Sequence, residues 1–195
     1  MHTSPLRRTT RTSGTTRTTR PGLLQRGFTQ VEGLIVLAVA LVLLGAALPS
    51  FEQARERRQV EGVAAQVRTA VMHARSLALS QDRAVRLRVE TSAAGSCYVV
   101  HSGPQNACTC LNATESVCTA GARSFHMQYL APNQAVALSA NVGTMLFDPT
   151  LGTTSPTGTL SVRGRSGAEI RQVVSIMGRV RSCSPNGRVT GYPTC

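Results

Sequence analysis

The feature that most constrains this chain is a long apolar stretch near its N-terminus. From Phe28 to Leu48 there are 21 residues, and the only charged one is Glu32. As a helix rising about 1.5 Å per residue, this stretch would span roughly 30 Å, the thickness of a bilayer core. A carboxylate costs about 2.5–3.5 kcal/mol at the bilayer centre on insertion scales, so Glu32 needs a partner. We therefore predict a membrane-spanning helix over residues 28–50 that carries one functional acid.

Cleavage of the chain after Gly27 would create the partner that Glu32 lacks. The new α-amine of Phe28 would lie four residues from Glu32, on the same face of a helix. A secretory signal peptide with a cleavage site at Ala46 and Ala47 is one alternative, but its apolar core would be only about 7–15 residues long. An ordinary signal anchor is another alternative. Neither of them explains an acid within the apolar segment.

The residues around this junction resemble a known N-terminal motif. The run from Gly27 to Ala38 is similar to the class III leader junction of type IV pilins and type II secretion pseudopilins, which also have a proline where Pro49 falls. The resemblance implies that prepilin peptidase cleaves after Gly27 and N-methylates Phe28, and that Glu32 serves assembly. Two positions depart from the family, which more often has large aliphatic residues there: Gln30 and Gly33.

Residues 1–27 have the composition of a leader peptide. They contain six arginines, many threonines and no acid, a composition that cannot build a core and that suits a cytoplasmic flank. A basic DNA-binding tail is the alternative, although the peptidase would remove this segment. Of the 21 basic residues, all arginine, 15 then remain against nine acids, a formal charge of +6. This balance favours polyanionic partners.

Residues 51–81 are expected to continue the same helix with an amphipathic pattern. Apolar residues recur at three- and four-residue spacing, which predicts one buried face ending near Ser80. The predicted face consists of Val60, Val63, Val67, Ala70 or Val71, Ala74, Leu77 and Ala78. The run from Ala74 to Ala78 also resembles the helix end in the GspH/FimT branch of the pilin-like family. In that family the first half of the helix lies in the membrane and the second half packs on a globular head.

From Asp82 onward the period of apolar residues changes to two. Val85, Leu87 and Val89 alternate with charged residues, which predicts a half-buried strand. Further strands are expected at residues 98–100, 124–130, 135–138, 145–147, 159–162 and 170–177. No crossover helix is visible between them, so they should be antiparallel. The predicted fold class is α+β, with the long helix packed on a C-terminal antiparallel β-sheet or β-sandwich head over residues 82–195.

All six cysteines lie in this head, which the resemblance places in the periplasm. An even number of cysteines in an oxidising compartment indicates disulfides. Cys183 and Cys195 bracket a turn-forming loop and should pair. A bond between Cys108 and Cys110 is disfavoured, which leaves two connectivities for the remaining four cysteines: Cys97, Cys108, Cys110 and Cys118.

Metal binding and catalysis have little support in the sequence. Zinc held by these cysteines with His101 or His126 is the alternative to disulfides, but paired C-x-x-C knuckles are absent. The sequence also has no nucleophile elbow, no phosphate-binding glycine loop and no paired-carboxylate signature. We therefore expect no metal, no cofactor and no enzymatic activity.

Arginines near the C-terminus are the one feature that bears on nucleic acid. The run from Gly178 to Arg181 resembles the G-R-x-R element of DNA-binding FimT-type minor pilins. In a strand, Arg179 and Arg181 would project from one face about 6–7 Å apart, comparable to the spacing of phosphates, with Val180 in the core. The other arginines expected to contribute to DNA-backbone binding are Arg163, Arg165 and Arg188. A solvated strand face and a contact with another minor pseudopilin are the alternatives.

The resemblance as a whole implies a minor pilin or pseudopilin with one membrane-spanning helix in the bacterial inner membrane and its head in the periplasm. The expected partners are prepilin peptidase, other major and minor pilins or pseudopilins, and the inner-membrane assembly platform. The subunit would assemble in a type II secretion pseudopilus or at a type IV pilus tip. DNA binding during natural transformation is the alternative. Because these settings share leader and helix, the sequence leaves them open.

Overall fold

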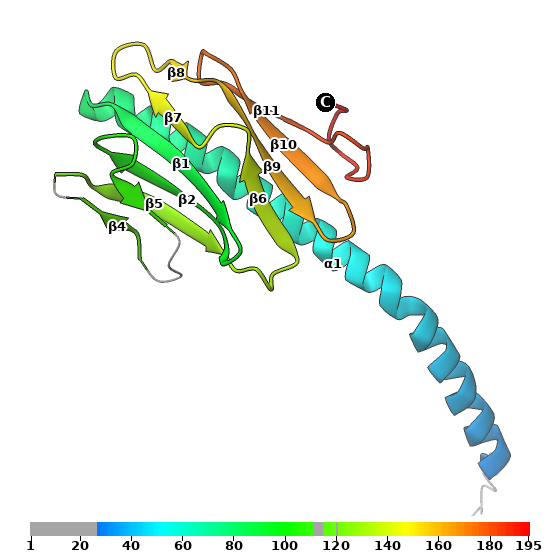
Figure 1. Ribbon diagram of the computed structural model, residues 1–195. Coiled ribbons are helices and arrows are strands. Elements are labelled where there is room, and N and C mark those ends of the chain that lie inside the picture. Colours follow the sequence, from blue (N-terminus) through cyan, green and yellow to red (C-terminus); the bar gives the residue numbers. More distant parts are fainter. Residues whose placement is uncertain (1–26, 111–114, 120) are drawn as a thin grey trace, which may run out of the picture. The chain divides into compact units, whose positions relative to one another are not determined.

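The computed structural model describes residues 27–110, 115–119 and 121–195. The leader arginines therefore lie outside the described residues. The described chain contains one helix, α1 (Gln30–Gln81), followed by eleven short strands (Figure 1). It divides into two compact units, the first ending at Leu43 and the second running from Leu44 to Cys195.

The first unit holds the apolar part of α1. The helix begins at Gln30, and Thr29 caps it, because the backbone N–H of Glu32 donates to Thr29 Oγ1 at 3.3 Å. The helix contains an 18-residue window that is long and apolar enough to cross a membrane, and none of that window is buried. This exposure, together with the apolar composition, suits a membrane anchor.

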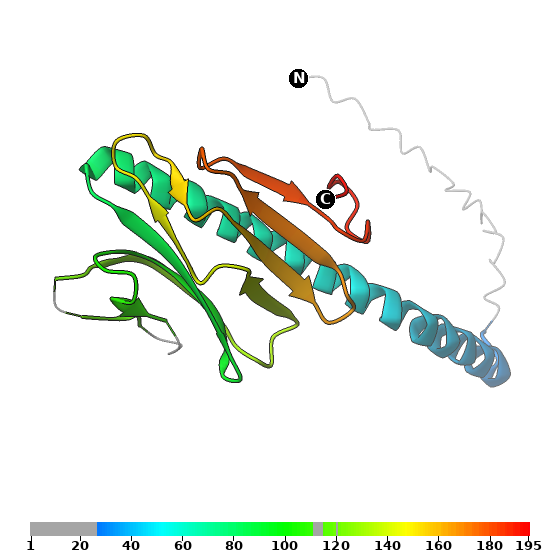
Figure 2. The same ribbon diagram turned by 45° about the horizontal axis from the view of Figure 1, so that its top comes forward.

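The second part of α1 buries the face that the sequence predicts. Its buried residues are Val60, Ala64, Val67, Ala70, Val71, Ala74 and Ala78, with Val63 and Leu77 partly buried beside them. Four of the seven buried positions are alanines, which allow the sheets to approach the helix closely. The buried face expected from the apolar spacing is therefore present from Val60 to Ala78, and this part of α1 forms one wall of the head's core (Figures 1 and 2).

Two antiparallel sheets pack on this helix face. The first has the order β5-β2-β1-β7-β8 and consists of β1 (Val85–Ser92), β2 (Gly95–Ser102), β5 (Ser124–Leu130), β7 (Thr144–Phe147) and β8 (Thr154–Ser155). The second has the order β11-β10-β9-β6 and consists of β6 (Val136–Ala140), β9 (Gly158–Gly164), β10 (Glu169–Val174) and β11 (Val180–Cys183). A small hairpin joins β3 (Cys108–Thr109) to β4 (Val117–Cys118). The predicted α+β fold is confirmed, with both sheets sharing one helix.

The two sheets are joined at Leu138 of β6. Its backbone N–H donates to Ser96 Oγ at 2.9 Å, and its carbonyl accepts a hydrogen bond from Thr91 Oγ1 at 3.2 Å. Leu138 is itself fully buried. The core is therefore continuous across the two sheets, with Tyr98 and Phe147 as its largest fully buried side chains.

Strand β2 is longer and more buried than the sequence predicts. The expected strand at residues 98–100 runs from Gly95 to Ser102, and every residue of it is buried. One face of β2 lies in the main core, while the other belongs to a second cluster formed by Cys97, Val99, Cys108 and Cys110. The disulfide-bonded segment with β3 and β4 thus covers the face of β2 that would otherwise meet water.

The strand expected at residues 170–177 is too long at its C-terminal end. It ends at Val174, and the chain turns through Ser175 to reach β11, with Ser175 N–H donating to the Arg179 carbonyl at 2.9 Å. Gly178 closes this turn with a φ of +67°, and a Cβ there would lie 2.8 Å from the Gly152 carbonyl oxygen. The turn therefore requires glycine at this position.

Candidate functional site

The six cysteines form three disulfides. Cys183 pairs with Cys195 at a Cα–Cα distance of 4.9 Å, as expected from the loop between them. The other four resolve the two connectivities that the sequence leaves open: Cys97 bonds Cys110, and Cys108 bonds Cys118. Each sulfur is therefore bonded to another sulfur, so these cysteines offer no thiolate to the zinc ion considered as the alternative.

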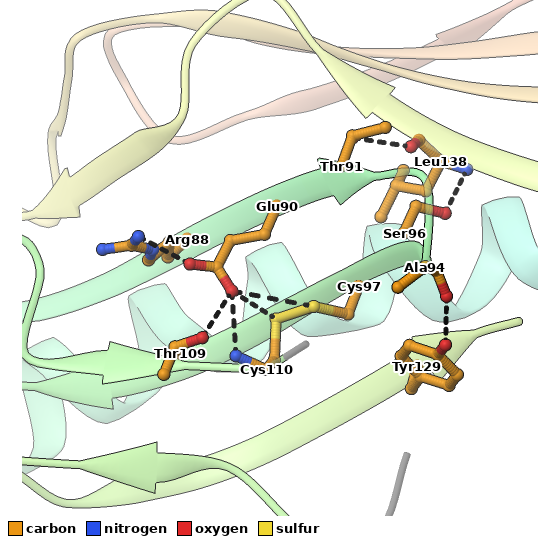
Figure 3. The surroundings of a disulfide bond; sticks show 10 residues. All are labelled: Arg88, Glu90, Thr91, Ala94, Ser96, Cys97, Thr109, Cys110, Tyr129 and Leu138. Atoms are coloured by element: carbon orange, nitrogen blue, oxygen red, sulfur yellow. Dashed lines mark hydrogen bonds and ion pairs between the residues drawn. A yellow bond between two sulfur atoms is a disulfide. The ribbon is translucent and has the colours of Figure 1, made fainter. Parts of the chain in front are cut away.

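Glu90 of β1 fixes the disulfide-bonded segment to the sheet (Figure 3). Its Oε2 accepts hydrogen bonds from the Cys110 backbone N–H at 2.9 Å and from Thr109 Oγ1 at 3.0 Å, while Oε1 pairs with Arg88. Oε2 also lies 3.6 Å from Cys110 Sγ and 3.9 Å from Cys97 Sγ. Since bonded sulfurs carry no hydrogen, these are packing contacts, and the group is a structural anchor.

The two histidines considered as ligands belong to the hydrogen-bond network of the head. His101 is fully buried, its Nδ1 lies 3.0 Å from the Ser102 carbonyl, and burial lowers the pKa of its imidazole. His126 Nε2 lies 3.2 Å from the Tyr98 hydroxyl. Burial, and then the charge of His73, lower the pKa of His126, while burial raises the pKa of Tyr98 to about 12. Both imidazoles are therefore biased toward their neutral forms.

Arg179 and Arg181 are exposed and flank the half-buried Val180, as alternation predicts. Only Arg181 lies within a strand, because Arg179 belongs to the turn before β11. Within the described ranges, no acidic side chain forms an ion pair with either of these arginines. Their guanidinium groups are therefore available to an anionic partner.

Arg163 is held in an ion-pair cluster on the outer face of the second sheet. Its Nη2 and Nε donate to Glu169 Oε2 at 2.8 and 3.1 Å, and Arg171 Nε donates to Glu169 Oε1 at 2.7 Å. Burial alone would raise the pKa of the Glu169 carboxyl, but the two guanidiniums hold it below its ordinary value. Half of the positive charge that Arg163 and Arg171 bring is thereby neutralised.

The other two arginines expected to contribute lie at the opposite end of the second sheet. Arg188 Nη1 donates to the Ser166 carbonyl at 2.7 Å, and Arg165 Nη2 to the Asn133 carbonyl at 2.9 Å. Ser166, in the β9–β10 turn, binds Glu56 of α1, whereas the turn before β11 lies beside Arg75. The 19 residues from Glu56 to Arg75 correspond to roughly 28 Å along the helix. The five arginines therefore do not form one surface.

The junction that the leader motif predicts lies outside any regular element. Residues 27–29 precede α1 in irregular backbone, and Phe28 is 84% exposed. A Cβ built on Gly27 would meet no atom within 4 Å. Glu32 follows this junction in the first turn of α1.

The exposed apolar part of α1 and the β head are the two features that indicate the class of protein. An exposed apolar helix that continues into the core of an antiparallel β head is the architecture of pilin-like subunits. The family model described as type II transport protein GspH matches residues 63–178, more than half of the chain, and the chain belongs to this family. It is thereby a member of the minor pilin and pseudopilin group.

The comparison with curated proteins gives no match. Among solved structures, the type IV minor pilin FimU of Pseudomonas aeruginosa matches with a TM-score of 0.48 and 17% sequence identity. That match covers 65% of this chain and 89% of the FimU chain.

Proposed function

We propose that this chain is a minor pseudopilin that is cleaved after Gly27, methylated at Phe28 and assembled in a type II secretion pseudopilus or at a type IV pilus tip. The observation that carries the proposal is the division of α1. The second part of α1 packs into the core of the head. The first part is apolar and exposed, and the predicted cleavage junction lies directly before it. A helix of this kind has a lipid phase or neighbouring helices as its natural surroundings.

The head supports the same role. It offers an antiparallel frame held by three disulfides, which suits a periplasmic location. Prepilin peptidase, other pilins or pseudopilins and an inner-membrane assembly platform are the proposed partners. The membership in the type II transport protein GspH family favours the secretion pseudopilus among the possible settings.

Processing tests this proposal directly. Protein extracted from membranes of its own cells should have N-methylated Phe28 as its first residue, because the junction is exposed and followed by Glu32. Intact mass and N-terminal sequencing measure this. A Gly27→Leu variant should retain the leader, while Gly33→Leu, a matched change on the other side of the junction, should be processed normally. A mature N-terminus at Leu48 would overturn the proposal.

DNA binding is the second candidate function, and it is favoured by one observation, the unpaired and exposed Arg179 and Arg181. Two guanidiniums two residues apart can each contact a phosphate, which would give backbone binding without sequence preference. Arg163 is engaged by Glu169, and Arg165 and Arg188 lie at the other end of the sheet. The candidate site is therefore smaller than the sequence suggests.

A mobility-shift titration of the mature chain with duplex DNA tests this second function. Arg179→Gln/Arg181→Gln should bind about tenfold more weakly, and its affinity should fall less steeply with salt, by about one unit of log–log slope per lost phosphate contact. Arg165→Gln/Arg188→Gln removes the same charge at the other end and should bind within about twofold of wild type. Equal binding by both double variants would exclude the site. A deletion strain scored for exoprotein secretion and for uptake of labelled DNA then shows which activity depends on the chain.

A further inference from the structure

A groove lies between the last turns of α1 and the β10–β11 hairpin. It has a volume of about 480 Å³, and we refer to it as the α1–β11 groove. Its lining consists of Arg68, Met72, Arg75, Ser76 and Leu79 of α1 with Gly178, Arg179 and Val180 of the hairpin. All of these residues belong to the second unit, so the groove is a feature of the head itself.

Exposed apolar side chains gather at this end of the head. Met72 and Leu79 are 55% and 45% exposed, and the adjoining hairpin turn carries Ile176 at 62% and Met177 at 54%. The backbone N–H of Thr154, the first residue of β8, donates to the Ile176 carbonyl at 2.8 Å, so the end of the β7–β8 loop adjoins the same turn. Figure 1 shows this loop and the β10–β11 turn together at the end of the head where α1 stops. Exposed apolar side chains near one another are candidates for a contact with a partner.

The charge around the groove has one sign. Three arginines line it, Arg68, Arg75 and Arg179, and none of the nine acids of the chain is among its lining residues. Arg75 Nε donates to the Gly152 carbonyl at 3.0 Å, which fixes that side chain at the groove. In the described part of the chain, Arg68 and Arg179 have no ion-pair partner. The positive charge of the groove therefore has no counter-charge among the lining residues. A partner would have to supply the negative charge.

We propose that the α1–β11 groove binds an apolar protein segment that carries a carboxylate, supplied by a neighbouring pilin-like subunit. This inference rests on the proposed function and adds the face and chemistry of the contact. Apolar side chains of the segment cover Met72, Leu79 and Val180, and removal of that surface from water drives binding. The carboxylate pairs with the guanidiniums at the rim.

Nucleic acid fits the groove less well than such a segment. Phosphates could pair with Arg68 and Arg179, but a phosphate backbone brings no apolar surface to the lining residues Met72 and Leu79. The groove lining also contains no aromatic ring on which a base could stack. An acidic and apolar segment satisfies both parts of the groove at once.

Photo-crosslinking of the full chain in its own cells tests this assignment. A photoreactive phenylalanine analogue replaces Met72 or Leu79, both exposed, so the core of the head is left intact. The same analogue at Val117, an exposed residue of β4 that does not line the groove, is the control. Adducts from Met72 and Leu79 should contain a pilin-like subunit whose cross-linked peptide includes apolar residues and an Asp or Glu. Val117 should not give that adduct.

Charge reversal then tests the electrostatic part. Arg68→Glu/Arg179→Glu should lower the yield of the adduct at least tenfold. Arg55→Glu/Arg123→Glu, which makes the same change of charge outside the groove, should leave the yield within twofold. Replacing the Asp or Glu of the partner's cross-linked peptide with Arg should restore the adduct of the Arg68→Glu/Arg179→Glu chain.

Four outcomes would overturn the inference: a nuclease-sensitive adduct, an adduct with a second copy of this chain, an adduct peptide without an acid, and no adduct at all. Sequencing the N-terminus of the same protein distinguishes failure of the groove assignment from failure of the proposed function. Mature chain beginning at methylated Phe28 without the expected adduct removes only the groove assignment. Chain that retains its leader removes both.

Discussion

Glu32→Val should lower incorporation of the mature chain into filaments at least tenfold while leaving its amount in the membrane unchanged. The valine variant inserts more easily into lipid, because a carboxylate costs about 2.5–3.5 kcal/mol at the bilayer centre. It would lose the anion that we propose pairs with the α-amine of Phe28, its own before assembly and a neighbour's afterwards. The ratio of sheared filament to membrane fractions measures the effect, and three intact disulfides show that the head is folded.

The structure suggests a second role for Glu32 that matched variants can separate. Glu32 stands in the first turn of α1, where a carboxylate gains about 0.3–1 kcal/mol from the helix dipole, and its N–H donates to Thr29 Oγ1. Glu32→Gln retains the shape and hydrogen-bonding capacity but loses the charge, whereas Thr29→Val removes only the cap. Pairing with Phe28 predicts that Glu32→Gln fails like Glu32→Val and that Thr29→Val assembles. Normal incorporation of Glu32→Val would contradict the pairing.

Removal of the Cys97–Cys110 disulfide should lower the unfolding free energy of the head more than removal of Cys183–Cys195. The Cys97→Ala/Cys110→Ala variant should lose about 2–5 kcal/mol of unfolding free energy, the usual range for a native disulfide. Both cysteines are fully buried, so the variant also leaves a cavity in the second cluster beside Val99. Urea unfolding of the mature chain measures this change.

The terminal disulfide provides the control for that experiment. Cys183–Cys195 closes a loop of similar length, with a sequence separation of 12 against 13, but Cys195 is exposed. Chain entropy alone would give the two double variants nearly equal losses. We expect Cys183→Ala/Cys195→Ala to lie at the low end of the range. Equal unfolding midpoints would show that burial around Cys97 and Cys110 adds nothing to the entropic effect.

Much of the fold could be predicted because its signals are local. The buried face of α1 follows from the spacing of Val60, Val67 and Ala74, and strand β5 matches its expected range of residues 124–130. The pairing of Cys183 with Cys195 follows from the turn between them. In each case the residues that decide the structure are close together in the sequence.

The rest depends on contacts that the sequence does not display. The disulfide-bonded segment that packs on the outer face of β2 allows this strand to be long and fully buried. That packing cannot be predicted without knowing that Cys97 bonds Cys110. The turn that ends β10 contains Gly178, where a Cβ would clash with the Gly152 carbonyl oxygen, a contact between residues far apart in the sequence. Arg163 and Arg165 are two residues apart, yet one is bound to Glu169 while the other lies in the turn at the sheet's end. Closeness in the sequence was therefore a poor guide to a shared surface.

The pairing of the first four cysteines has a consequence for export. The two disulfides interleave in the sequence. Cys108 lies within the loop closed by Cys97–Cys110, and Cys110 lies within the loop closed by Cys108–Cys118. If the head is exported as proposed, Cys97 and then Cys108 would reach the oxidising side first, and bonding in that order would join two cysteines that are not partners in the head. Correct pairing would then require thiol–disulfide exchange with Cys110 after it has emerged. The supply of folded subunits would therefore depend on a disulfide isomerase as well as on an oxidase.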